Sequence, residues 1–218
     1  MSTPGPEPAA TRAALEATRL YGIVDLGYAL REEIGAVTSQ LIEGGAGIIQ
    51  LRAKKSSEAE ILAMAKELAP ICRAARVPFV INDFPEIAAS VHADIIHVGQ
   101  DDLPVAEARA RAGKGVLVGK STHSLEQAVA AVEEGADYIG FGPIFSTPTK
   151  PEYEPIGPDH IAEVHRLVEI PIFCIGGIKD HNLPDLVAAG ARRAVIVSGL
   201  LSAENRVEMT RQCLDILS

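Results

Sequence analysis

The stretch Ile95–Asp102, Ile-Ile-His-Val-Gly-Gln-Asp-Asp, begins as an apolar run of strand length and ends in a polar turn. A strand of a parallel sheet reads as such a run because both of its faces are covered. The chain repeats this arrangement at Ile48–Lys54, Phe79–Asp83 and Tyr138–Lys150. Apolar strands with polar side chains at their carboxyl ends are typical of a (β/α)8 barrel, which carries its chemistry at that end.

Eight apolar runs alternate with helical segments along the chain. The predicted strands are Leu20–Val24, Ile48–Leu51, Phe79–Ile81, Ile95–Val98, Val116–Val118, Tyr138–Phe141, Ile172–Ile175 and Ala194–Val197. Helices are expected between them, for example over Ala29–Glu43 and over Ser56–Arg76, where Ser57 and Glu60 stand at capping-box spacing. We therefore predict an α/β fold, a single-domain (β/α)8 TIM barrel over residues 19–218. Residues 1–18 are expected to form a flexible leader and an N-terminal helix. An open doubly wound sheet is the alternative, disfavoured by the even spacing and by the absence of Gly-x-Gly-x-x-Gly at the first turn.

Composition and charge narrow the class of protein. The formal net charge of −9 argues against non-specific nucleic-acid binding, but it allows a phosphorylated ligand held by local cations. The three cysteines are widely separated and form no Cys-x-x-Cys pair, so neither a zinc site nor a disulfide framework is expected. The start of the chain lacks a signal-peptide pattern, and no apolar stretch reaches membrane-spanning length. We expect a cytoplasmic protein without a membrane partner. The sequence leaves the oligomeric state open, a homo-oligomer included.

Two cations follow the second predicted strand. Alternate residues of a strand point the same way, so Gln50, Arg52 and Lys54 are expected on one face at the barrel mouth. The fork of an arginine and the mobile charge of a lysine suit a pyrophosphate. A solvated loop after a strand is the alternative, and this segment alone favours neither interpretation.

Two carboxylates stand at the ends of neighbouring strands. Asn82 and Asp83 follow the third predicted strand, and Asp102 follows the fourth. Mg2+ prefers a few carboxylate oxygens together with water and substrate phosphates, and it would neutralise a leaving diphosphate. Alternatively, Asp102 caps the following helix, which is expected over Pro104–Ala112.

The same alternation makes a prediction about side-chain direction around the fourth strand. It aims Gln100 and Asp102 inward, which makes Asp101 the weaker ligand candidate. It also places His97 on the opposite face, where a packed structural histidine is expected.

Lys120-Ser121-Thr122-His123 is expected just past the fifth strand. Ser121 could bond a ligand or start a turn, and His123 could move a proton or be an inert surface residue. Nothing nearby completes a serine nucleophile triad, which excludes that hydrolase chemistry.

The long loop after the sixth strand and the glycine turns after the seventh and eighth are further candidates. Thr147, Thr149 and Lys150 supply two hydroxyls and a cation, and long loops in compact domains are usually functional. Gly176-Gly177 and Val197-Ser198-Gly199 stand where this fold commonly binds one phosphate. One Mg2+–diphosphate region and one monophosphate region indicate a transferase that joins two phosphorylated ligands and releases pyrophosphate.

Taken together and in this order, the motifs resemble those of the thiamine-phosphate synthase family. The stretches that carry the resemblance are Gln50–Lys54, Asn82-Asp83, His97–Asp102, Ser121–His123, Gly142–Lys150 and Ile175–Ile178. The resemblance runs from about Tyr21 to the end of the chain. It implies an alkyl or aryl transferase of thiamine biosynthesis. Such an enzyme couples 4-amino-2-methyl-5-hydroxymethylpyrimidine diphosphate with a thiazole phosphate, carboxylated or not, and yields thiamine phosphate and pyrophosphate.

The resemblance also implies roles for single residues. Asp83 and Asp102 would hold Mg2+. The pyrimidine diphosphate would be bound by Gln50, Arg52, Lys54, Asn82, Ser121 and Lys150. The thiazole phosphate would be held by Thr147, Thr149, Gly177, Val197 and Ser198. Lys54, Ser121 and Lys150 are the expected catalytic residues, acting on a diphosphate that leaves before the thiazole nitrogen attacks.

One departure and two alternative functions accompany the resemblance. The family commonly has arginine where this chain has Phe84, which removes a cation near the diphosphate or a structural ion pair. A thiazole tautomerase paralogue would share the fold and a histidine matching His123, but it is expected to lack the metal and diphosphate residues. A non-catalytic phospho-ligand-binding barrel would keep the phosphate-binding glycines but would not need two carboxylates together with Arg52, Lys54 and Lys150. We also expect the loop Pro143–Pro155 to close as a lid, because a cationic intermediate must be kept from water.

Overall fold

A computed structural model describes residues 7–147 and 154–218 of the chain, and it contains a closed parallel barrel of eight strands in sequence order. The strands are β1 (Leu20–Asp25), β2 (Ile48–Arg52), β3 (Phe79–Asn82), β4 (Ile95–Val98), β5 (Leu117–Thr122), β6 (Tyr138–Phe141), β7 (Ile172–Cys174) and β8 (Ala194–Ile196). Pairing of Leu20 with Ala194 joins β1 to β8 and closes the barrel. The predicted single-domain (β/α)8 barrel is confirmed.

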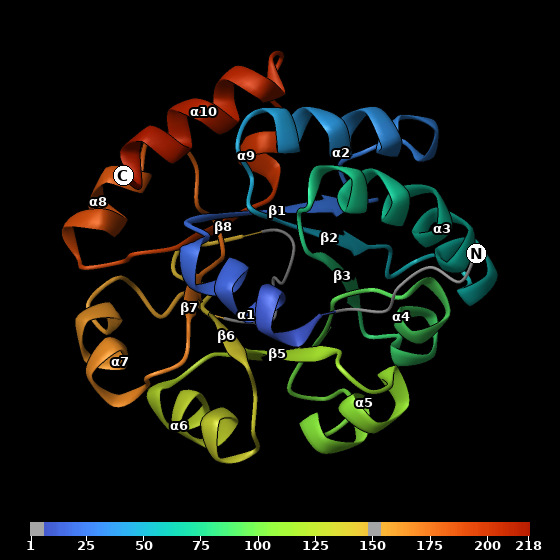
Figure 1. The fold of residues 1–218 in the computed structure, drawn as a ribbon. Coiled ribbons are helices and arrows are strands. Elements are labelled where there is room, and N and C mark those ends of the chain that lie inside the picture. The colour runs from blue at the N-terminus through green and yellow to red at the C-terminus, as the bar shows by residue number, and fades with distance from the viewer. Residues whose placement is uncertain (1–6, 148–153) are drawn as a thin grey trace.

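Helices surround the barrel as an outer ring, except α1, which crosses one open end (Figure 1). The described helices are α1 (Pro8–Ala17), η1 (Arg31–Glu33), α2 (Ile34–Glu43), α3 (Glu58–Ala75), α4 (Pro85–Val91), α5 (Val105–Ala112), α6 (Leu125–Glu133), α7 (Ile161–Leu167), α8 (Leu183–Ala188), α9 (Ser198–Leu201) and α10 (Arg206–Ile216). Helix α3 begins at the predicted capping box, in which Ser57 and Glu60 bond each other's backbone N–H. No helix within the described ranges is long and apolar enough to cross a membrane.

Two hydrophobic cores follow from the alternation of side chains along the strands. One core lies between the barrel and its helices, and the other fills the barrel interior. The interior core contains the rings of Tyr21, Tyr138 and Phe173, whose centroids lie 5.5–6.1 Å apart. Gly119 leaves room for one of them, because a Cβ at this position would lie 2.1 Å from Tyr138 Cζ. Leu15 of α1 is only 1% exposed and closes the interior from the amino-terminal end.

Two predicted boundaries are wrong. The helix expected from Ala29 begins only at the 3-10 turn η1, since Asp25 C=O accepts hydrogen bonds from the N–H groups of Tyr28 and Ala29 and holds a turn there. Strand β5 continues to Thr122, so Lys120, Ser121 and Thr122 lie within the strand, and only His123 lies past it. Pairing with β6 and the bond from Thr122 Oγ1 to Gly140 C=O extend this strand.

Candidate active site

A pocket opens at the carboxyl ends of the strands, and residues from all eight strands or the turns after them line it. Every described residue that the sequence predicted for the site lines this pocket. These residues are Gln50, Arg52, Lys54, Asn82, Asp83, Asp102, Ser121, Thr147, Gly177, Val197 and Ser198. The remaining two, Thr149 and Lys150, lie outside the described residues. The structure therefore brings together side chains from strands β2 to β8, as the barrel prediction requires.

The cations after β2 are held by carboxylates of the neighbouring strands. Arg52 Nη1 lies 2.5 Å from Asp25 Oδ2, and only 15% and 6% of these side chains are exposed. Lys54 Nζ lies 3.1 Å from Asp83 Oδ2. Gln50, Arg52 and Lys54 share one face, so the predicted alternation along β2 is confirmed. The solvated-loop alternative is wrong for Arg52, because its guanidinium is largely buried.

Asp83 occupies an unfavourable position for a carboxylate. Burial raises its pKa, the carboxyl group of Asp102 in hydrogen-bonding contact raises it further, and only Lys54 opposes these two effects. Its backbone φ of 67° lies in the left-handed region, which residues other than glycine adopt rarely. Two carboxyl groups in contact need a shared proton or a cation. The pair therefore has the electrostatics of a cation-binding site.

Asp102 stabilises its own turn. Its Oδ2 accepts a hydrogen bond of 2.6 Å from Gly99 N–H. The N-cap of α5 is Pro104, and no side chain caps that helix. The alternative that Asp102 serves as the helix cap is therefore wrong.

The residues present fit Mg2+. Among residues 7–147 and 154–218, no three His, Cys, Asp or Glu side chains cluster to form a complete metal cage. Mg2+ does not need such a cage, because it is usually held by one or two carboxylates, water and substrate phosphates. Asp83 and Asp102 supply that number of carboxylates beside the cations Arg52 and Lys54.

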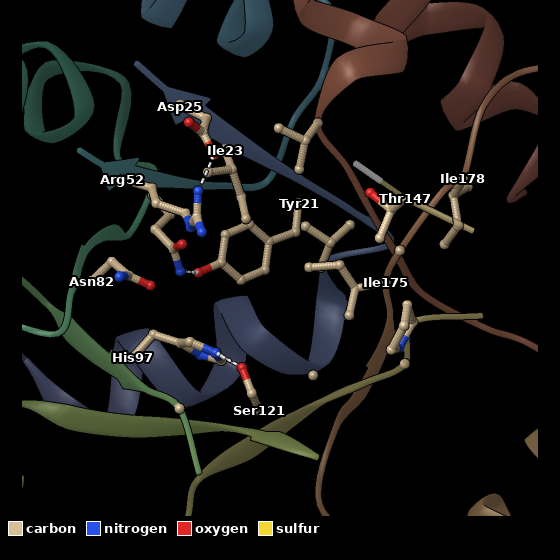
Figure 2. A pocket seen from close by; sticks show the side chains of 18 of the residues that line it. Tyr21, Ile23, Asp25, Arg52, Asn82, His97, Ser121, Thr147, Ile175 and Ile178 are labelled. Carbon is tan, nitrogen blue, oxygen red and sulfur yellow. Dashed lines mark hydrogen bonds and ion pairs between the residues drawn. The ribbon is translucent and has the colours of Figure 1, made fainter. Parts of the chain in front are cut away.

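The predicted direction of His97 is wrong. Its Nε2 lies 2.9 Å from Ser121 Oγ and its Nδ1 lies 2.9 Å from Tyr138 Oη, inside the pocket (Figure 2). Strand β4 ends at Val98, so alternation counted back from Gln100 across the turn does not hold. Counted from Ile95, which belongs to the interior core, His97 points inward as well. Gln100 instead bonds the backbone C=O of Ser121.

A chain of hydrogen bonds crosses the floor of the pocket. Gln50 Nε2 donates to Tyr21 Oη at 2.8 Å, and Tyr21 Oη lies 3.1 Å from Tyr138 Oη. Burial raises the pKa of both phenols well above the ordinary value. Tyr21, Tyr138 and Asp25 were not among the predicted site residues, although period-two counting along β1 puts Tyr21 and Asp25 on one face.

The other side of the pocket is built from the turns after β6, β7 and β8. Figure 2 shows Thr147 and Ile178 across Tyr21 from Arg52 and Asn82. Gly177 has a φ of 65°, and a Cβ here would lie 2.5 Å from Ser146 C=O, so a side chain would collide with the loop after β6. Helix α9 begins at Ser198, as this fold leads one to expect. The N–H of Ile144, at the base of the loop, donates to the C=O of Ile175, which directly follows β7. Residues 148–153 lie outside the described structure, so the lid stays a prediction.

His123 and Phe84 have clear structural surroundings. His123 lines the pocket, its Nδ1 lies 2.5 Å from Gly142 C=O, and its backbone N–H donates to Gln127 Oε1. It is therefore part of the pocket wall, and a role in moving a proton stays a prediction. Phe84 is partly buried against the outer core at the start of α4, where it packs as a hydrophobic side chain.

Known proteins resemble this chain over nearly its whole length. The family described as thiamine monophosphate synthase matches residues 20–200. Thiamine-phosphate synthase of Chloroflexus aurantiacus is 42% identical, over 92% of this chain and 93% of that protein. Thiamine-phosphate synthase of Halalkalibacterium halodurans is also 42% identical, over 86% and 89% respectively. The solved structure of thiamine phosphate pyrophosphorylase from Pyrococcus furiosus superimposes with a TM-score of 0.84 at 29% identity, covering 95% of this chain and 97% of that one.

Proposed function

This chain belongs to the thiamine monophosphate synthase family, and from that premise we propose how its own residues carry out the reaction. Its function is that of a thiamine-phosphate synthase, a transferase of thiamine biosynthesis. The substrates are a hydroxymethylpyrimidine diphosphate and a thiazole phosphate, and the products are thiamine phosphate and pyrophosphate. A cytoplasmic location and a homo-oligomeric state stay predictions.

One observation carries the mechanism: Asp83 and Asp102 are in contact beside Lys54, with Arg52 on the same rim. In our proposal the diphosphate binds here, against Arg52, Lys54 and Asn82. Asp83 and Asp102 would hold Mg2+, which when bound would supply a Lewis acid that neutralises the diphosphate. The contact between two carboxyl groups supports this assignment, because a cation relieves their repulsion.

The bond changes need charge stabilisation and no protein nucleophile. The bond between the pyrimidine methylene carbon and the diphosphate oxygen breaks, and both electrons leave with the oxygen. The thiazole nitrogen then gives its lone pair to that carbon. Arg52 and Lys54 stabilise the negative charge that develops on the leaving group, and Ser121 donates a hydrogen bond to it. Lys150 is proposed for the same task from the resemblance alone.

The remaining residues position the acceptor and limit water. Thr147, Gly177, Val197 and Ser198 are proposed to hold the thiazole phosphate on the opposite side of the pocket. The buried floor of Tyr21 and Tyr138 excludes bulk water from below, which protects a cationic intermediate from hydrolysis. Holding both substrates in one pocket supplies proximity.

A thiazole tautomerase and a non-catalytic barrel are the alternatives. Neither needs Asp83, Asp102, Arg52 and Lys54 on one rim, and their presence together favours the synthase.

A two-substrate assay tests the proposal. Pyrophosphate should form only when both substrates and Mg2+ are present, and a chelator should stop its release. Conversion of a thiazole tautomer without the pyrimidine substrate, at the same rate with chelator, would instead support the tautomerase.

A further inference from the structure

Five side chains from five strands form one unbroken hydrogen-bonded chain inside the barrel. It runs from Gln50 on β2 through Tyr21 on β1, Tyr138 on β6 and His97 on β4 to Ser121 on β5, with steps of 2.8, 3.1, 2.9 and 2.9 Å. The two tyrosines are 1% exposed and Gln50 is 2% exposed, so water does not compete for these groups at the inner end. Ser121 stands at the other end, where the chain reaches the ligand pocket.

The inner end fixes the direction of the first bond. In the amide orientation of this structure the side-chain nitrogen of Gln50 faces Tyr21 Oη, and because that nitrogen can only donate, Tyr21 Oη accepts. Within the described residues, Tyr138 Oη is the other partner of Tyr21 Oη, and it is the one acceptor available for the Tyr21 hydrogen. Tyr21 therefore donates to Tyr138.

The next steps follow because each phenol has one hydrogen. Burial keeps both phenols protonated, since it raises the pKa of each. Tyr138 already accepts from Tyr21, so its hydrogen goes to His97 Nδ1. An imidazole that accepts at Nδ1 carries its hydrogen at Nε2, and Nε2 faces Ser121 Oγ (Figure 2).

The opposite direction is unfavourable. If His97 carried a hydrogen at Nδ1, in either the neutral or the charged form, it would donate to Tyr138. Tyr138 would then donate to Tyr21, and the Tyr21 hydrogen would face the donor nitrogen of Gln50. A buried hydroxyl hydrogen would lose its acceptor, which native structures avoid.

We propose that this one-way chain holds His97 as the Nε2–H tautomer and so makes Ser121 a hydrogen-bond donor toward the ligand. Ser121 Oγ accepts from His97, and its own hydrogen points to a ligand atom. The ligand atom opposite Ser121 must therefore be an acceptor, as an anionic phosphate oxygen is, and a ligand that places an N–H there is disfavoured. Tyr21, Tyr138 and His97 act as positioning residues. Naming the acceptor as a diphosphate oxygen rests on the proposed function, whereas the tautomer does not.

Nuclear magnetic resonance of the 15N-histidine-labelled full chain tests the tautomer without any substrate. The two-bond and three-bond 15N–1H correlations of His97, assigned by their loss in His97→Gln, should show the Nε2–H form. An Nδ1–H or doubly protonated ring overturns the proposal. Tyr138→Phe should shift the Nδ1 resonance because it removes the donor, whereas Tyr28→Phe, outside the pocket lining, should not. Equal Nδ1 resonances in both variants also overturn it.

Steady-state kinetics test the link to Ser121. Tyr138→Phe should lower kcat/KM for the pyrimidine diphosphate about two- to tenfold, the effect of one net hydrogen bond. In a Ser121→Ala variant, Tyr138→Phe should cause no further loss of kcat/KM, because the hydrogen-bonded side chains act through the Ser121 hydroxyl. An equal loss in both backgrounds refutes the link. If the enzyme releases no pyrophosphate although His97 is the Nε2–H tautomer, the proposed function is wrong. The proposed direction of the hydrogen bonds from Gln50 to Ser121 is then still supported.

Discussion

Replacing Asp83 by asparagine should stabilise the metal-free protein while it removes activity. The change keeps the size of the side chain and removes the charge that burial and Asp102 disfavour. Asparagine also tolerates the left-handed backbone of this position, where φ is 67°. The proposed metal site would lose one of its two carboxylates, so turnover should fall even though the fold becomes more stable.

The size of the effect follows from the contacts that Asp83 makes. Its ion pair with Lys54 is lost, but 46% of that lysine side chain is exposed, so the pair contributes only about 0–1 kcal/mol. Single stabilising substitutions commonly contribute about 0.5–2 kcal/mol. A net gain of about 0.5–1 kcal/mol corresponds to roughly 1–4 °C in Tm for a chain of this size.

The gain should depend on pH. Because the folded-state pKa of Asp83 is raised, its protonation contributes stability that is fully present below the ordinary value of 3.8 and is lost as pH rises through the raised pKa. The Tm advantage of Asp83→Asn should therefore be largest at neutral pH. It should shrink as the pH is lowered toward 3.8, where the parent carboxyl is itself neutral.

Calorimetry in the presence of a chelator measures the Tm of the metal-free variants, and the pyrophosphate assay measures their turnover. Lys54→Met is the matched control, since it leaves the carboxyl pair without its cation and should lower Tm at neutral pH. A lower Tm for Asp83→Asn at neutral pH would show that the carboxylate stabilises the metal-free fold. The idea of a pair poised for a cation would then be wrong.

Three further changes test other parts of the structure. Asp25→Asn removes the charge that holds Arg52, so kcat/KM for the pyrimidine diphosphate should fall about tenfold or more. The KM for the thiazole phosphate should change little. Equal effects on both substrates would contradict this prediction. Gly119→Ala places a Cβ 2.1 Å from Tyr138 Cζ and should destabilise by about 1–3 kcal/mol in thermal unfolding; an unchanged Tm would show that the ring moves freely. Ser57→Ala removes the capping box of α3 and should cost about 1 kcal/mol of unfolding free energy at unchanged turnover, whereas a loss of activity would be unexpected.

Features that depend on local periodicity could be predicted from the sequence. The eight apolar runs fixed the strand count because each run is buried on both faces, and β2 kept its alternation as far as Lys54. The meeting of Asp83 with Asp102 followed from barrel topology, which places the ends of β3 and β4 side by side. Such inferences need only the strand period and the order of the strands.

Features that depend on turns or on distant partners could not be predicted in the same way. Alternation failed for His97 because it was carried across Gly99, where the backbone has left the strand. Tyr21 and Tyr138 read as ordinary core residues, and their role appears only when the closed barrel brings them within 3.1 Å. The pairing of Asp25 with Arg52, by contrast, joins the ends of the consecutive strands β1 and β2, so strand order could have predicted it.

The charged side chains at the rim of the pocket are already paired with one another. A ligand that binds there must replace these pairs and must leave no side chain with an unpaired charge. Before a ligand binds, Arg52 is paired with Asp25, and Lys54 with Asp83. A neutral molecule cannot displace these carboxylates, because a cation would then be left partly buried without a partner. An anion alone could take Lys54, but it would leave Asp83 against Asp102. An anion that arrives with a divalent cation satisfies both sides at once, since the cation takes the carboxylates and the anion takes the lysine. The pairing seen in the structure therefore agrees with our proposal that a metal–diphosphate complex binds here and not either component by itself.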